Sequence, residues 1–124
     1  MQQKKKMVLI IDDSYLIIER LTDMLNESEH IGEVIHALTG SQELETLQSR
    51  TPDIVLLDIN LPDTSGVELL RILKEKYPGI IVIMLTNQAN DYYRKLCLNL
   101  GANHFADKSK DFEFIPSLIE SLQT

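Results

Sequence analysis

Cysteine is nearly absent from this sequence of 124 residues, which contains only Cys97. A single cysteine cannot form an intramolecular disulfide or a cysteine-rich zinc site, and it fits a reducing, cytoplasmic compartment. The three histidines, at positions 30, 36 and 104, lack the spacing of metal ligands, so we expect them to be structural or surface residues. We interpret Cys97 as a small core residue.

Long apolar runs, basic charge and glycine-rich loops are also missing. No run approaches the roughly 20 residues of a membrane helix, and the five apolar residues before Asp12 are too few for a signal peptide. With 12 basic and 19 acidic residues, the net charge of −7 argues against direct binding to nucleic acid. No Gly-x-Gly-x-x-Gly and no loop ending in Gly-Lys-Ser/Thr occurs, which argues against dinucleotide and nucleoside-triphosphate binding.

What is present predicts one globular α/β domain over residues 1–124, with a basic, solvated tail at 1–6. Three continuous apolar runs, 7–11, 54–57 and 80–85, are typical of strands buried on both faces, and weaker strands fit 33–38 and 103–107. Apolar residues spaced three and four apart predict helices over 14–26, 41–49, 67–77, 91–100 and 112–122. This fivefold β–α alternation predicts a doubly wound parallel sheet with right-handed crossovers.

Polar residues follow the predicted strands at the edge where such sheets bind ligands. Asp12 and Asp13 follow the first strand, Asp58 the third and Thr86 the fourth, and Lys108 follows the fifth. Singly, each has an ordinary explanation, such as capping the next helix. Together they place three carboxylates, a hydroxyl and an ammonium on one sheet edge.

Crowded carboxylates without histidine or cysteine favour a hard cation, and Mg²⁺ is the natural choice. One carboxylate can then attack a phosphoryl group, with Lys108 and Thr86 binding the phosphoryl oxygens. Asp12 and Asp13 are adjacent and suit joint metal binding, which leaves Asp58 as the predicted nucleophile.

Four segments in order, 10–14, 57–66, 84–86 and 101–108, carry a resemblance over nearly the whole chain. The sequence resembles the receiver domain of two-component response regulators, in particular the stand-alone chemotaxis type. The resemblance implies a flavodoxin-like (βα)5 fold with strand order 2-1-3-4-5. It also implies that Asp58 is the phosphoacceptor and that Asp12, Asp13, Asp58 and the main-chain carbonyl of Asn60 bind Mg²⁺.

The family's switch pair matches Thr86 and Phe105. On phosphorylation, the threonine hydroxyl of the family is drawn to the phosphoryl group and the aromatic ring turns into the space it leaves. The resemblance therefore implies a phosphorelay protein that is phosphorylated by a histidine kinase or a histidine phosphotransfer protein. A downstream protein would read the face of the fourth helix, fifth strand and fifth helix, and phosphorylation could also drive homodimerisation through it. Beyond its own phosphorylation and dephosphorylation we expect no enzymatic activity.

Two positions depart from the family pattern. Ser109 follows Lys108 where the family usually has proline, so we expect a trans peptide bond there. Asn87 follows Thr86 where a small residue is usual, and we predict that Asn87→Ala accelerates phosphorylation by a small donor.

Other readings stay open. A phosphohydrolase with an aspartate nucleophile usually has a second carboxylate two residues later, where this chain has Asn60. A receiver fold that binds partners without phosphorylation is a third class, left open by Ser109 and Asn87. We expect a stand-alone regulator, with a piece of a longer one as the alternative, and Tyr92 is a candidate partner contact.

Overall fold

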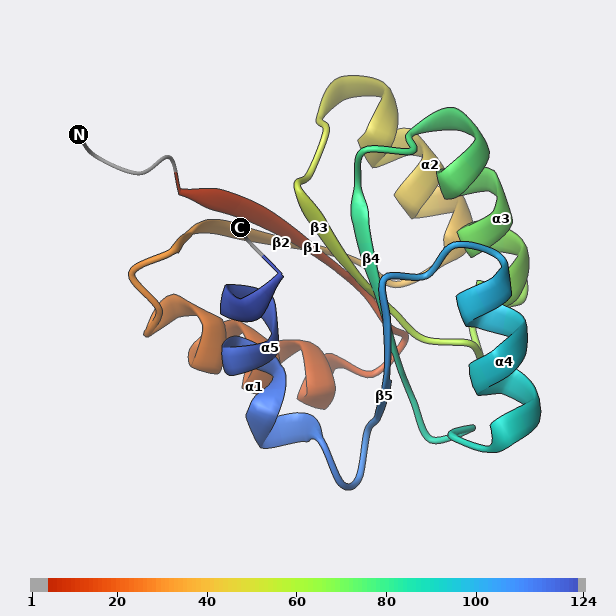
Figure 1. Ribbon diagram of the computed structural model, residues 1–124. Helices are drawn as coiled ribbons and strands as arrows, with labels where there is room; N and C mark the ends of the chain where they lie inside the picture. Colours follow the sequence, from red (N-terminus) through yellow and green to blue (C-terminus); the bar gives the residue numbers. More distant parts are fainter. Residues whose placement is uncertain (1–4, 123–124) are drawn as a thin grey trace.

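The computed structural model describes residues 5–122, in which strands and helices alternate along the chain (Figure 1). The strands are β1 (Lys6–Ile11), β2 (Ile31–Ala37), β3 (Ile54–Leu57), β4 (Ile81–Thr86) and β5 (His104–Asp107). The helices are α1 (Tyr15–Asn26), α2 (Gly40–Ser49), α3 (Gly66–Lys76), α4 (Asp91–Asn99) and α5 (Ile115–Ser121), with the 3-10 turn η1 (Phe112–Phe114) before α5. Within these residues, no helix is long and apolar enough to cross a membrane.

The five strands form one parallel sheet in the order β2-β1-β3-β4-β5. Helices α1 and α5 cover one face, and α2, α3 and α4 cover the other (Figure 1). This arrangement confirms the predicted doubly wound fold and its strand order. The strand order reverses between β1 and β3, so the carboxyl ends of these two strands flank the crevice where such folds bind ligands.

Each face of the sheet has its own hydrophobic core because successive side chains of a strand point to opposite faces. In β1, Val8 and Ile10 join the core under α1 and α5, whereas Leu9 and Ile11 join the core under α2, α3 and α4. β3 and β4 alternate in the same way, and all four residues of β3 are buried. Burial on both faces explains why these strands are continuous apolar runs in the sequence.

Most element boundaries differ from the predicted ones by one or two residues, and the differences at β1, β2 and the last helix have structural reasons or consequences. Lys6 lies in β1, where its amide donates to the carbonyl of His30 (2.9 Å), so this residue belongs to the sheet and not to a basic tail. Lys4 lies outside the described residues. β2 begins at Ile31, two residues earlier than predicted, and the last helix starts with the 3-10 turn η1 because Pro116 sits in the first turn of α5.

Two glycines shape the turns. The backbone of Gly101 has φ of 107°, a left-handed conformation that ends α4 as predicted. Gly66 opens α3 directly against the phosphoacceptor candidate: a Cβ there would lie 1.9 Å from the carbonyl oxygen of Asp58. The amide of Gly66 donates to the carbonyl of Ile59 (2.6 Å), so the chain after Asp58 folds back tightly onto the start of α3.

The buried face of α2 includes an acidic residue. The buried residues of α2 are Gly40, Glu43 and Leu47, whereas the other leucine of the helix, Leu44, is only partly buried. Glu43 is fully buried, and neither of its carboxylate oxygens has a hydrogen-bond partner among the described residues. Burial raises the pKa of Glu43 from 4.5 to about 8, so the folded protein keeps this side chain neutral at pH 7.

Candidate functional site

Backbone hydrogen bonds of the sheet fix the two central aspartates. The amide of Asp12 donates to the carbonyl of Ala37 in β2 (3.2 Å), and the amide of Asp58 donates to the carbonyl of Ile11 in β1 (3.1 Å). Both residues therefore extend the sheet by one position and end at the same edge. With Asp13, they form a cluster in which one oxygen of each carboxylate lies within 4.8 Å of the others. Asp12 and Asp58 are buried, and Asp13 is exposed.

Lys108 joins the two buried carboxylates from the opposite end of the chain. Its Nζ lies 2.6 Å from Oδ2 of Asp12 and 2.9 Å from Oδ2 of Asp58, and its side chain is only 10% exposed. The amide of Lys108 donates to the carbonyl of Thr86 (2.9 Å), which holds the lysine backbone beside the end of β4. The three predicted residues Asp12, Asp58 and Lys108 thus form one buried ionic network.

Burial and charge act in opposite directions in this network. Burial raises the pKa of Asp12, and the neighbouring charge of Asp58 adds to this, while the hydrogen bonds from Lys108 and from the Ser14 amide offset part of the shift. Burial alone would lower the pKa of Lys108, but the hydrogen bonds and charges of Asp12 and Asp58 outweigh it, so the pKa is raised. Lys108 is therefore a permanent cation at neutral pH.

The charge of the cluster suits a divalent cation. Three carboxylates and one ammonium leave a charge of −2 when all are ionised. The donors are all oxygen, the kind of ligand that Mg²⁺ prefers, and the exposure of Asp13 leaves the cluster open on one side. The residues present therefore fit a metal such as Mg²⁺.

The family model of the response regulator receiver domain matches residues 8–120, which include every residue of this network. The chain belongs to the receiver domain family. The receiver is 36% identical over 117 residues to the DNA-binding transcriptional activator EvgA of Escherichia coli K12, covering 91% of this chain and 55% of EvgA. It functions in phosphorelay signalling, as this family does.

Solved receiver structures have the same fold. The BeF3-activated receiver domain of DrrB superposes with a TM-score of 0.85 at 27% identity, covering 95% of this receiver and 97% of that chain. A CheY-like receiver domain from Methanospirillum hungatei gives a TM-score of 0.84 at 29% identity, covering 96% and 94%. The chain spans about half the length of the curated relatives it matches, 55% of one and 50% of another.

Thr86 and Phe105, the predicted switch pair, lie on the neighbouring strands β4 and β5. Thr86 pairs with Asp107 across β4 and β5, and Met84 pairs with Phe105, so Thr86 and Phe105 are diagonal neighbours on one face of the sheet. Both are fully buried. The hydroxyl oxygen of Thr86 accepts the amide of Gln88 (3.0 Å), a contact that does not use the hydroxyl proton.

The loop after Asp58 places Asn60 beside the site. The amide of Asn60 faces Oδ1 of Asp58 at 3.4 Å, and the residue forms an isolated bridge with Ser65. The carbonyl that closes this bridge is that of Ile59, which accepts the amide of Gly66. That Asn60 offers its own carbonyl to a metal stays a prediction.

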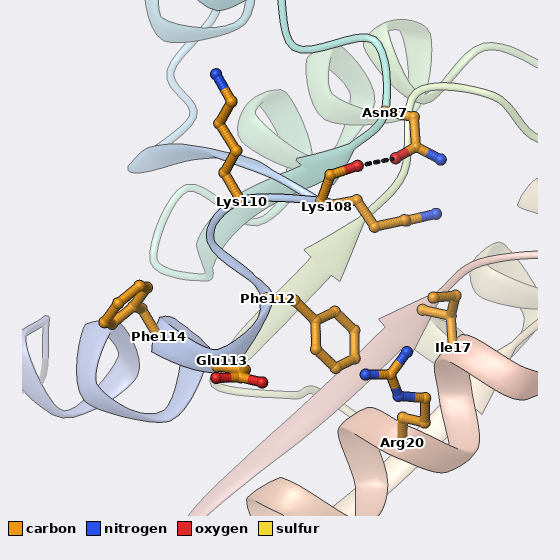
Figure 2. A pocket seen from close by; sticks show the side chains of 9 residues that line it. Ile17, Arg20, Asn87, Lys108, Lys110, Phe112, Glu113 and Phe114 are labelled. Atoms are coloured by element: carbon orange, nitrogen blue, oxygen red, sulfur yellow. Dashed lines mark hydrogen bonds between the residues drawn. The ribbon is translucent and has the colours of Figure 1, made fainter.

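The two residues that depart from the family pattern contact each other at the mouth of the site. The hydroxyl of Ser109 donates to the side-chain oxygen of Asn87 (3.4 Å; dashed in Figure 2). They line a cavity of about 550 Å³ together with Lys108 and Phe112. The centroid of the Phe112 ring lies 4.7 Å from Cζ of Arg20. No cis peptide bond occurs in residues 5–122, so the Lys108–Ser109 bond is trans as predicted.

The sequence did not reveal Glu43 or Arg94 as residues of interest. Glu43 lies four residues before the core residue Leu47, and this spacing could have indicated its burial. Arg94 carries no such signal, because its contacts with Phe105 depend on how α4 packs beside β5. The three histidines are exposed, Cys97 is buried, and the Tyr92 side chain is 69% exposed, all as expected.

Proposed function

We propose that this receiver accepts a phosphoryl group on Asp58 from a phosphohistidine of a histidine kinase or a histidine phosphotransfer protein. A carboxylate oxygen of Asp58 forms the new bond to phosphorus as the phosphorus–nitrogen bond breaks. The electron pair of that bond stays on the histidine nitrogen, which leaves as a neutral imidazole once protonated. The single observation that carries this proposal is the buried Asp12–Lys108–Asp58 network of a receiver fold, at the sheet edge where the strand order reverses between β1 and β3.

Each residue of the site has a role in this step. Asp12 and Asp13, with Asp58 and the carbonyl of Asn60, would hold Mg²⁺, which supplies positive charge to the transferring phosphoryl oxygens. Lys108 already forms an ion pair with Asp58, and its ammonium group would move to bind a phosphoryl oxygen. The Thr86 hydroxyl would donate its proton to another phosphoryl oxygen.

Phosphorylation would then change the face formed by α4, β5 and α5. If Thr86 moves toward the phosphoryl group, Phe105 gains space on the same face of the sheet. We propose that a downstream protein reads this change, that homodimerisation through the same face is an alternative readout, and that the receiver has no catalytic activity beyond its own phosphorylation and dephosphorylation. The proposal includes a cytoplasmic location and one receiver domain over residues 1–124.

Intact mass after incubation with acetyl phosphate and Mg²⁺ tests the site. We expect a gain of one phosphoryl group in the wild type and in Asp91→Asn, an exposed control on α4. Neither Asp58→Asn nor the metal-free sample should gain it. An adduct on Asp58→Asn would refute the assignment of the nucleophile.

A missing adduct needs a second measurement, because an acyl phosphate can hydrolyse before detection. Beryllofluoride with Mg²⁺ avoids this loss, and amide NMR shifts around Thr86 and Phe105 report its binding. No adduct and no shifts together would overturn the proposed phosphorylation and favour a receiver that binds partners without it.

A further inference from the structure

Arg94 of α4 makes two contacts with the proposed switch residue Phe105. Its Nη1 donates a hydrogen bond to the carbonyl oxygen of Phe105 (3.2 Å). Its Cζ lies 5.1 Å from the centroid of the Phe105 ring, within cation–π range. One side chain therefore holds both the backbone and the ring of this residue.

These contacts bear on the burial of Phe105. The ring is 1% exposed although β5 is the edge strand of the sheet, and α4 runs beside β5 in Figure 1. Arg94 and Phe105 both line a cavity of about 360 Å³ that reaches Phe114 and Leu118. The guanidinium thus contacts the ring at the edge of an open volume on the α4, β5 and α5 face.

We propose that Arg94 is a positioning residue that stabilises the unphosphorylated position of Phe105 and so sets how readily the receiver activates. This inference rests on the proposed function. In the arrangement described, the Thr86 hydroxyl oxygen is engaged with the Gln88 amide. Drawing Thr86 toward Asp58 would open space for the Phe105 ring, and a ring that turns into this space would give up its contact with the guanidinium.

The choice of arginine matters for this role. A guanidinium is planar, so it can lie over an aromatic face while its edge donates a hydrogen bond, whereas an ammonium is a point charge without a flat face. Arg94→Lys should therefore lose much of the stacking and keep the charge. Arg94→Met should lose the charge and the donor but keep most of the apolar stem.

The test is a titration of beryllofluoride with Mg²⁺, followed through fluorine-labelled phenylalanine, with the Phe105 signal assigned from Phe105→Leu. We expect Arg94→Met to bind beryllofluoride about tenfold more tightly than wild type, because the cation–π contact no longer opposes the movement of the ring. Arg94→Lys should fall between them. Lys95→Met is the matched control, since Lys95 is exposed on the same helix, and it should bind as wild type does.

Equal or weaker binding by Arg94→Met would overturn the proposal. If wild type neither binds beryllofluoride nor gains a phosphoryl group, the proposed function fails, and the fluorine signal of Phe105 in the free protein then decides the role of Arg94. A shifted or broadened Phe105 signal in Arg94→Met, but not in Lys95→Met, would support a positioning role. An unchanged signal would exclude it.

Discussion

Glu43 gives the sharpest prediction for stability, because its carboxyl group is buried and has no hydrogen-bond partner within residues 5–122. Its pKa is about 8 in the folded protein and 4.5 as an ordinary glutamate. The folded state therefore binds one more proton than the unfolded state between these two values. The contribution of Glu43 to stability is fully present below pH 4.5, falls as the pH rises through this window, and is lost above pH 8.

The size of the effect follows from the difference between the two pKa values. At about 1.4 kcal/mol per pH unit, complete loss of this contribution corresponds to about 5 kcal/mol. At pH 7 the unfolded chain has lost the proton and the folded chain keeps it, which corresponds to about 3 kcal/mol. A small domain is stable by only about 5–15 kcal/mol, so ionisation of this one buried carboxyl group would remove a large part of the stability.

Glu43→Gln removes the titration and keeps the shape of the side chain. We expect its free energy of unfolding to exceed that of wild type by under about 1 kcal/mol at pH 5, and by about 3 kcal/mol at pH 7 and 4–5 kcal/mol at pH 8.5. Urea unfolding at these three pH values measures the difference, since every other titrating group is common to both proteins. Glu45→Gln, an exposed change on the same helix, should show no such trend. A difference between Glu43→Gln and wild type that is the same at all three pH values would refute the reasoning.

Three further predictions concern the site. Asn87→Ala should accelerate phosphorylation by acetyl phosphate, because it removes the side chain that contacts Ser109 at the entrance of the site. Ser109→Ala should have a smaller effect. A stopped-flow phosphorylation rate of Asn87→Ala equal to that of wild type would contradict this prediction. Gly66→Ala should lower the free energy of unfolding by at least about 2 kcal/mol, since its Cβ would overlap the Asp58 carbonyl, and thermal unfolding checks it; wild-type stability would mean that the loop can shift at no cost. Lys108→Met should bind Mg²⁺ more tightly by about tenfold, because a cation no longer occupies the carboxylate oxygens, yet it should be phosphorylated more slowly. Isothermal titration and the mass assay measure the two effects, and weaker Mg²⁺ binding would show that Lys108 instead organises the cluster.

The order of strands and helices was accessible from the sequence because it depends on local patterns. β3 is apolar at every position since both of its faces are buried, and the helices repeat their apolar residues at helical spacing. The convergence of Asp12, Asp58 and Lys108 was also predictable, because the carboxyl ends of parallel strands meet at one edge of a sheet. The sequence thereby determined the fold class and the candidate residues of the site.

Only the tertiary structure decided which of these residues touch and what surrounds them. Lys108 donates hydrogen bonds to both Asp12 and Asp58, and Asp12 lies 96 positions before it in the chain. α2 buries Glu43 beside Leu47, and α4 lays Arg94 over Phe105. Each of these contacts depends on how a helix is rotated and seated against the sheet, and that is set by packing between elements distant in sequence, which a local pattern does not encode.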